Sequence, residues 1–141
     1  MQCKLKCESI LSALKGLGFK LTPQRRSIVE ILTCDLSHPS AQTIFQSSRQ
    51  KHPTISLSTV YSTLAMLKKH RLISELEFDG MDNRYDVDTD SHINMICVQC
   101  GRIEDYTNPA PLLPEVVRKQ TGFTIHDSRF EFYGKCQLCA K

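Results

Sequence analysis

The stretch ISLSTVYSTLAMLKKHRLISELEFDGMDNRYDV, residues 55–87, decides the fold because its hydrophobic period changes after Leu72. Before that point, apolar residues recur at helical spacing, which predicts a helix capped by Ser56 or Ser58. Beyond it, apolar and polar residues alternate around DGMDN, residues 79–83, which predicts a β-hairpin with a glycine-containing turn. The buried side of the helix is expected to consist of Val60, Leu64 and Leu67.

Three further helices are expected upstream. CESILSALKGLG places apolar residues at helical spacing, LTPQRR suggests a helix with Thr22 as N-cap and Pro23 in its first turn, and SHPSAQ suggests one capped by Ser40. Three or four helices followed by a hairpin form a winged helix, in which the last helix enters the DNA major groove. A plain helical bundle with a solvated polar face is the alternative. The exposed face of the last helix carries Ser58, Thr59, Tyr61, Ser62 and Lys68, which can contact base edges or phosphates.

Charge is distributed unevenly along the chain. Residues 1–73 contain 11 Lys and Arg against 3 Asp and Glu, a net charge of +8, whereas residues 74–141 contain 7 against 12, a net charge of −5. A basic first half suits a polyanion such as DNA, and an acidic second half suits metal cations or a partner subunit. Ordinary solvated surface charge would give the same totals.

The second half predicts a smaller unit. Residues 86–91 are polar and acidic and suggest a hinge, and INMICVQCGRIEDY suggests two short strands joined through a cysteine pair. A helix over 109–122 and a strand over 123–136 are expected to follow. The organisation is therefore an α+β chain with a DNA-binding domain at 1–85, a hinge at 86–91 and a smaller second domain at 92–141, whose cysteine pair suits metal. About 50 residues bury too little surface to be stable alone, so metal or dimerisation should help.

Four cysteines stand in two Cys-x-x-Cys pairs, and their thiolates suit a closed tetrahedral zinc site. The pairs are separated by 35 residues, whereas common zinc ribbons separate them by about 15–20. A helix and a strand folding back between the pairs would accommodate the longer loop. A thiol–disulfide switch and an iron–sulfur cluster are the competing interpretations. The four are Cys97, Cys100, Cys136 and Cys139. Cys3, Cys7 and Cys34 show no comparable pattern and are expected to be free thiols.

A second group of ligand-type residues surrounds the expected hinge. It consists of His38, Asp86, His92 and Asp105. Imidazole nitrogen combined with carboxylate oxygen suits Fe(II) or Mn(II), although each residue alone has an ordinary surface interpretation. Ordinary structural roles are expected for the remaining histidines, His52, His70 and His126.

The chain resembles the ferric uptake regulator family of metal-dependent transcription regulators. The resemblance rests on LTPQR, SHPSA, STVYSTL, RYD, HINMICVQCGRIEDY and YGKCQLC, which occur in this order over nearly the whole chain. It implies a homodimer that binds double-stranded operator DNA, with N-terminal winged helices, a C-terminal α/β dimerisation domain and structural zinc on the four paired cysteines.

Within the family, the peroxide-responsive branch is the most similar. The resemblance implies that His38, Asp86, His92 and Asp105 hold a regulatory Fe(II) or Mn(II) ion. The fifth ligand of that branch is a histidine, and this chain has Asn94 there. We therefore expect weaker metal binding or a four-ligand site, unless nearby carboxylates, Asp90 and Glu104, compensate. A further ligand set of iron and zinc sensors is not expected, because Ile93 stands at one of its positions.

The mechanism implied by the resemblance is oxidation of a ligating histidine, His38 or His92, by hydrogen peroxide at bound Fe(II). Loss of metal then opens the dimer and derepresses genes. The alternative is a metal-uptake regulator that responds to Fe(II) or Mn(II) occupancy. The resemblance also implies DNA contacts from Lys15 and Tyr61, with Ser62 standing where some relatives carry arginine.

Other classes of protein fit the sequence poorly. It shows no nucleophile–base motif and no phosphate-binding glycine loop, so an enzyme is not expected. No apolar run approaches the roughly 20 residues that span a bilayer. The N-terminus is broken by charge and does not resemble a signal peptide, so a cytoplasmic location is expected.

Overall fold

The structure is a computed structural model of the 141-residue chain, and it describes residues 1–107 and 113–141. The chain divides into two compact units, Met1–Thr89 and Asp90–Lys141. The division falls within the stretch expected to be a hinge, but Asp86 itself belongs to a strand of the first unit. In the described ranges no helix has the length and apolar character needed to cross a membrane.

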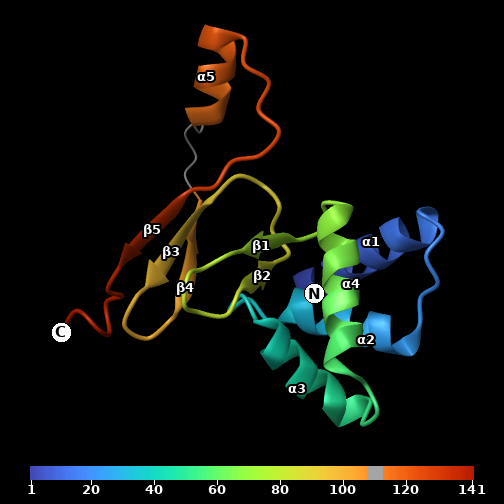
Figure 1. Ribbon diagram of the computed structural model, residues 1–141. Coiled ribbons are helices and arrows are strands. Elements are labelled where there is room, and N and C mark those ends of the chain that lie inside the picture. The colour runs from blue at the N-terminus through green and yellow to red at the C-terminus, as the bar shows by residue number, and fades with distance from the viewer. Residues whose placement is uncertain (108–112) are drawn as a thin grey trace. The chain divides into compact units, whose positions relative to one another are not determined.

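The first unit begins with four helices, coloured blue to green in Figure 1. They are α1 (Gln2–Gly16), α2 (Pro23–Cys34), α3 (Ala41–Lys51) and α4 (Leu57–Lys69). The expected N-caps are confirmed, because Thr22, Ser40 and Ser56 each accept a hydrogen bond from a backbone N–H in the first turn that follows. His52 and His70 are the C-cap residues of α3 and α4.

A two-stranded hairpin follows α4, where the hydrophobic period changes. Strands β1 (Ser74–Leu76) and β2 (Arg84–Asp86) pair antiparallel, with Glu75 opposite Tyr85. Four helices followed by this hairpin confirm the winged helix (Figure 1).

The hydrophobic core of the described chain lies in the first unit. Apolar side chains from all four helices pack there at 0–6% exposure: Cys7, Ile10, Leu11, Leu14, Ile28, Val29, Leu32, Ala41, Ile44, Ile55, Val60, Leu64, Leu67, Ile73 and Tyr85. The buried stripe predicted for α4 is confirmed by Val60, Leu64 and Leu67. This core supports α4 from one side and leaves its polar face to solvent.

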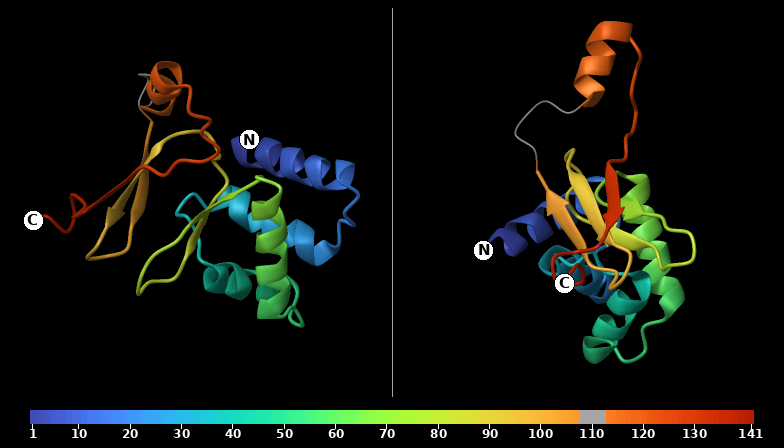
Figure 2. Two further views of the ribbon diagram at one scale, coloured as in Figure 1. Left: turned by 45° about the horizontal axis from the view of Figure 1, so that its top comes forward. Right: turned by 90° about the vertical axis from the view of Figure 1, so that its left-hand side faces the viewer.

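The second unit is built on a three-stranded sheet (Figure 2). Its elements are β3 (Ile93–Cys97), β4 (Ile103–Tyr106), α5 (Leu113–Thr121) and β5 (Glu131–Gly134), and the strand order is β4-β3-β5. The expected pair of short strands around the first cysteine pair is confirmed, since β3 and β4 are antiparallel. Strand β5 returns parallel to β3 and brings the second cysteine pair beside the first.

Two expectations for this unit need adjustment. The first residues of the expected helix, 109–112, lie outside the described residues, and α5 ends before Gly122 as expected. The strand expected over 123–136 is wrong except at Glu131–Gly134. The reason is that β3 begins at Ile93, so beyond Phe130, whose carbonyl accepts from the N–H of Asn94, the residues toward Phe123 have no described strand beside them.

The N-terminal cysteines also differ from expectation. The sulfur atoms of Cys3 and Cys34 form a disulfide, so the prediction of free thiols is wrong for these two residues and right for Cys7, which is buried. Packing of α1 on α2 brings the Cα atoms of the pair to 5.1 Å, within the range that a disulfide spans. Hydrophobic spacing within each helix does not reveal this crossing.

Candidate metal centres

The four paired cysteines converge at one end of the β3–β5 sheet. Cys97 ends β3, Cys100 follows in the turn toward β4, and Cys136 and Cys139 lie just beyond β5. Their sulfur atoms all lie within 4.8 Å of one another, and Sγ of Cys100 is 3.8 Å from Sγ of Cys136. Because β5 runs parallel to β3, the 35-residue separation of the pairs in sequence becomes contact in space.

The surroundings of the four cysteines favour deprotonation of one thiol and oppose deprotonation of several at once. Backbone N–H groups lower the pKa of Cys97 to about 6, chiefly that of Cys136, which donates to Sγ of Cys97 over 3.3 Å. The neighbouring thiol of Cys136 raises the pKa of Cys139 to about 12. Four sulfurs this close therefore need a cation before all of them can lose their protons.

The residues fit a structural zinc ion. Tetrahedral coordination with Zn–S bonds of about 2.3 Å places sulfur atoms about 3.8 Å apart, which matches the Cys100–Cys136 distance. A set of four cysteine ligands leaves no open position, which is typical of zinc that stabilises a fold.

A pair of ligand-type residues lies in the first unit. Nε2 of His38 is 3.4 Å from Oδ2 of Asp86, and the two residues are only 4% and 7% exposed. The other carboxylate oxygen of Asp86 accepts a hydrogen bond from the backbone N–H of Asp88 over 2.8 Å. That bond orients the carboxylate so that Oδ2 faces the imidazole.

The loop that carries His38 is anchored to strand β2. Arg84 donates through Nε to the carbonyl of His38 and through Nη2 to the carbonyl of Ser37, the latter over 2.6 Å. The backbone N–H of Tyr85 donates to the carbonyl of Pro39 over 3.1 Å. His38 has a φ of 58°, a left-handed conformation that few non-glycine residues adopt and that such anchors can hold. The motif RYD thus contributes a carboxylate and also fixes the histidine that it faces.

A second pair lies in the other unit. Nε2 of His92 is 3.6 Å from Oδ1 of Asp105, and His92 is 9% exposed. Nδ1 of His92 lies 2.8 Å from the backbone carbonyl of Asp90. A carbonyl only accepts hydrogen bonds, so Nδ1 donates to it and Nε2, beside the carboxylate, is the ring nitrogen left for a metal. A metal-binding histidine commonly donates its other ring N–H in this way.

Asn94 belongs to the same face of the sheet as this pair. It lies directly opposite Asp105 in the β3–β4 register, and directly opposite side chains share a face. Its Oδ1 is buried, and no donor among the described residues forms a hydrogen bond to it. A buried acceptor without a donor is costly, so this oxygen is suited to a cation.

Of the two carboxylates named as possible compensation for Asn94, Glu104 lies on the other face of the sheet. It is opposite Met95, and its carboxylate is 3.2 Å from Nη1 of Arg102. Asp90 contributes its backbone carbonyl to the ring of His92. The alternation of side chains along β4 separates Glu104 from Asp105 and explains the difference.

Helix α4 presents the polar face expected to read DNA. Ser58, Tyr61 and Ser62 are exposed, Tyr61 by 52%, whereas Thr59 is half-buried and its hydroxyl lies 2.9 Å from that of the cap residue Ser56. Thr59 is therefore engaged in the helix cap. Lys15 is exposed in the last turn of α1.

Lys68 contacts the hairpin. Its Nζ is 2.5 Å from Glu75 and 3.1 Å from Glu77, and these hydrogen bonds raise the pKa of the lysine. Burial alone would raise the pKa of Glu75, but hydrogen bonds from Lys68, Asn83 and Tyr85 outweigh it and lower that pKa. The lysine expected to hold the DNA backbone is thus partly neutralised by the wing.

The comparisons with known proteins agree with this arrangement. The model of the ferric uptake regulator family matches residues 16–133. The peroxide operon regulator of Bacillus subtilis (strain 168) is 36% identical over 132 residues, which cover 93% of this chain and 91% of that protein. The structure of the Helicobacter pylori ferric uptake regulator Fur superposes with a TM-score of 0.79 at 28% identity, over 100% of this chain and 95% of that one. The Campylobacter jejuni peroxide stress regulator gives a TM-score of 0.73 at 30% identity, over 92% and 98%. The chain therefore belongs to the ferric uptake regulator family.

Proposed function

We propose that this chain is a metal-dependent transcriptional repressor that binds operator DNA as a homodimer and senses hydrogen peroxide through oxidation of a metal-ligating histidine. The observation that carries the proposal is the presence of one His–Asp pair in each unit, His38 with Asp86 and His92 with Asp105, in which Asp105 alone is exposed. A divalent ion bound by both pairs would tie the DNA-binding unit to the second unit. The peroxide-responsive relative from Bacillus subtilis supports the choice of signal.

The ligand set suits Fe(II) or Mn(II). Two imidazole nitrogens, two carboxylate oxygens and the amide oxygen of Asn94 make a mixed, mostly hard set, whereas zinc favours fewer and softer ligands. The Nδ1–H of His92, held by the carbonyl of Asp90, keeps that ring oriented for binding through Nε2. The anchored loop does the same for His38, whose carbonyl accepts from Arg84.

In the proposed redox step, the imidazole ring gains one oxygen atom from hydrogen peroxide. Bound Fe(II) would supply the electrons that activate hydrogen peroxide. A ring C–H of His38 or His92 becomes a C–OH group, and the second oxygen atom of the peroxide leaves as water. The oxidised ring is a poorer ligand, so the metal leaves and the two units lose their tie.

Metal and DNA must affect each other reciprocally. If metal raises the affinity for operator DNA by some factor, operator DNA raises the affinity for metal by the same factor. In this proposal Ser58, Tyr61 and Ser62 contact the major groove and Lys15 contacts the adjacent backbone or minor groove. Thr59 contributes mainly to the helix cap.

The second unit supplies zinc binding and the dimer in this proposal. Zinc on the four cysteines holds β3 and β5 together at their ends. The exposed apolar side chains of Tyr106 and Phe132, 51% and 61% exposed, are suited to burial against a second copy.

The test is mass spectrometry of protein loaded with Fe(II) and treated with peroxide. Trypsin releases residues 27–49, which contain His38, and residues 85–102, which contain His92. We expect one added oxygen on either peptide and none on the exposed His126 in the same digest. The Mn(II)-loaded protein should show no such addition and should keep its affinity for a DNA sequence selected from a random library.

The digest must separate histidine from its neighbours. Residues 27–49 also contain Cys34, and residues 85–102 also contain Met95, so fragment ions must place the oxygen on the ring. If chelation releases DNA while peroxide leaves both rings unmodified, the chain is an Fe(II)- or Mn(II)-responsive metal-uptake regulator.

A further inference from the structure

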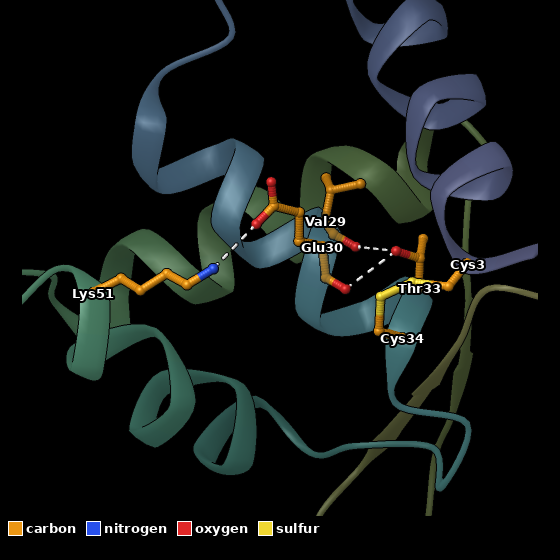
Figure 3. The surroundings of a disulfide bond; sticks show 6 residues. All are labelled: Cys3, Val29, Glu30, Thr33, Cys34 and Lys51. Atoms are coloured by element: carbon orange, nitrogen blue, oxygen red, sulfur yellow. Dashed lines mark hydrogen bonds and ion pairs between the residues drawn. A yellow bond between two sulfur atoms is a disulfide. The ribbon is translucent and has the colours of Figure 1, made fainter. Parts of the chain in front are cut away.

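The DNA-binding unit contains a thiol pair that neither metal centre uses. Cys3 lies in the first turn of α1 and Cys34 is the last residue of α2, and their sulfurs are bonded across 31 positions of sequence (Figure 3). One turn further along α1 lies Cys7, which is 6% exposed and unbonded.

The three thiols differ in access to solvent. Cys34 is exposed and Cys3 is half-buried, so small oxidants and reductants reach the bond between them. Burial raises the pKa of Cys7, against a hydrogen bond with Thr33 that lowers it. A buried thiol held in its protonated form is inert. Reactivity is therefore confined to Cys3 and Cys34.

The two cysteines lie at helix ends of opposite partial charge. Cys3 lies at the positive N-terminal end of α1, followed by Lys4 and then Lys6, an environment that stabilises an attacking thiolate. Cys34 lies at the negative C-terminal end of α2, followed by Asp35, so its thiol retains its proton more readily. Cys3 is therefore suited to react first and Cys34 to resolve the product.

We propose that Cys3 and Cys34 form a peroxide-reactive, reversible thiol pair, a modification site separate from both metal centres. The Cys3 thiolate attacks hydrogen peroxide, the O–O bond breaks, and Cys3 becomes a sulfenic acid as hydroxide leaves. The Cys34 thiol then displaces the sulfenic oxygen as water and forms the disulfide. Overall, two thiols lose two electrons and two protons, and one peroxide becomes two waters. A dithiol reductant reverses the change by thiol–disulfide exchange.

The disulfide would be a covalent cross-link between two helices of the core. α1 and α2 both contribute to the buried core, through Ile10 and Ile28 among others, and the bond ties the start of one helix to the end of the other. Closing a loop of this length restricts the unfolded chain. Peroxide would thus stabilise the DNA-binding unit in the same conditions that release the regulatory metal.

The test begins with reduced, zinc-containing protein that carries no Fe(II) or Mn(II). After peroxide treatment and alkylation of free thiols, trypsin should yield residues 1–4 linked to residues 27–49. Cys7 falls in a separate peptide, 7–15, which should be alkylated. Without Fe(II) no oxygen is expected on His38, so the result does not depend on the proposed peroxide sensing at the histidines.

Variants and stability complete the experiment. Cys34→Ser should abolish the linked peptide, Cys7→Ala should retain it, and a dithiol should remove it from both wild type and Cys7→Ala. Oxidised wild type should melt about 10 °C or more above the reduced form, with no such difference for Cys34→Ser. Linkage of residues 1–4 to a zinc-site peptide, persistence of both thiols under peroxide, or equal melting of the two forms would overturn the proposal.

Discussion

The two units of the molecule differ in how they bury apolar surface. In the first unit, four helices close around a core in which Leu14, Ile28 and Leu67 are fully buried. In the second unit, the buried apolar residues among those described are Ile96, Cys97 and Ile103, at 2–5% exposure, and α5 buries none of its described side chains. Large apolar side chains instead stand exposed on it: Val98, Tyr106, Leu113, Val116, Phe123, Phe132, Tyr133 and Leu138.

This contrast indicates different sources of stability. A unit with its own core can fold from its sequence alone, whereas a small unit with an open surface needs a metal, a partner or both. In the proposed function, DNA reading belongs to the first unit and assembly to the second, while both units supply ligands to the regulatory metal. The need for a metal or a partner suits a sensor, because binding of a ligand causes the largest change in a unit that is least stable without that ligand.

Removing one zinc ligand should have the largest effect, and it should affect the second unit far more than the first. Cys136→Ser leaves three thiols at the site but keeps the backbone N–H that donates to Sγ of Cys97. We expect near-complete loss of bound zinc, of the dimer and of metal-dependent DNA binding, because structural zinc contributes about 10 kcal/mol or more to folding of such sites. Zinc content and sedimentation measure the loss.

The helical unit should survive the same change. Circular dichroism of Cys136→Ser should retain the helical signal of α1 to α4, and Cys3→Ser serves as a matched cysteine control that keeps zinc. If Cys136→Ser loses its helices together with its zinc, the two units do not differ as described.

Truncation in the core of the first unit is the converse change. Ile28→Ala removes a fully buried side chain and leaves a cavity, so the free energy of unfolding of that unit should fall by about 3 kcal/mol. Zinc content should be unchanged. Urea unfolding followed by the helical signal gives the first quantity and metal analysis the second. Loss of zinc from Ile28→Ala would contradict separate sources of stability.

A charge on the open sheet face should weaken assembly. Phe132 pairs in register with Met95, on the face opposite Asn94, so Phe132→Asp leaves the metal-ligand face untouched. We expect the dimer dissociation constant to rise about a hundredfold, as for an interface anchor worth about 2–3 kcal/mol. Leu36→Asp, at an exposed apolar residue of the first unit, is the control. Equal dissociation of both variants would remove Phe132 from the interface.

Local signals in the sequence were sufficient for the first unit. Thr22, Ser40 and Ser56 act as caps because each side chain needs only the backbone three residues ahead. The Cys-x-x-Cys turns are likewise local, and their four thiols suggested a shared zinc site with which the family resemblance agreed. Where the answer lay within a few residues, the pattern identified it.

Long-range packing was harder to predict. The disulfide of Cys3 with Cys34 depends on how α1 crosses α2, which neither helix reveals alone. Residues 123–129 have strand-like composition but pair with no strand among the described residues. Glu104 is adjacent to Asp105 in sequence but lies on the other face of the sheet. In each case the deciding contact is distant in sequence or absent from a single copy.

The departure at Asn94 offers a smaller test of the sensing unit. Asn94→His replaces a weak amide ligand by imidazole, so Mn(II) affinity should rise about tenfold, or about 1.4 kcal/mol. Asn94→Ala should lower it, because the buried oxygen at this position is removed. Isothermal titration of the zinc-containing protein measures both. If neither variant changes affinity, Asn94 is not a ligand.

The smallest effect is expected where α4 meets the wing. The carboxylate of Glu75, 14% exposed, accepts from Lys68, Asn83 and Tyr85, and its pKa is lowered from about 4.5 in the folded unit. A carboxylate with a lowered folded pKa adds stability above its unfolded pKa, and that contribution disappears as pH falls through the folded value. Glu75→Gln should therefore lower the free energy of unfolding by about 1 kcal/mol at pH 7 and by much less below pH of about 4.

Glu77, which contacts the same lysine but is 57% exposed, provides the control, since Glu77→Gln should change stability less at every pH. This network lies in the unit with its own core. Removing zinc should therefore leave the stability difference between Glu75→Gln and Glu77→Gln unchanged. A difference that changes with zinc would mean that the stability of the hairpin depends on the second unit.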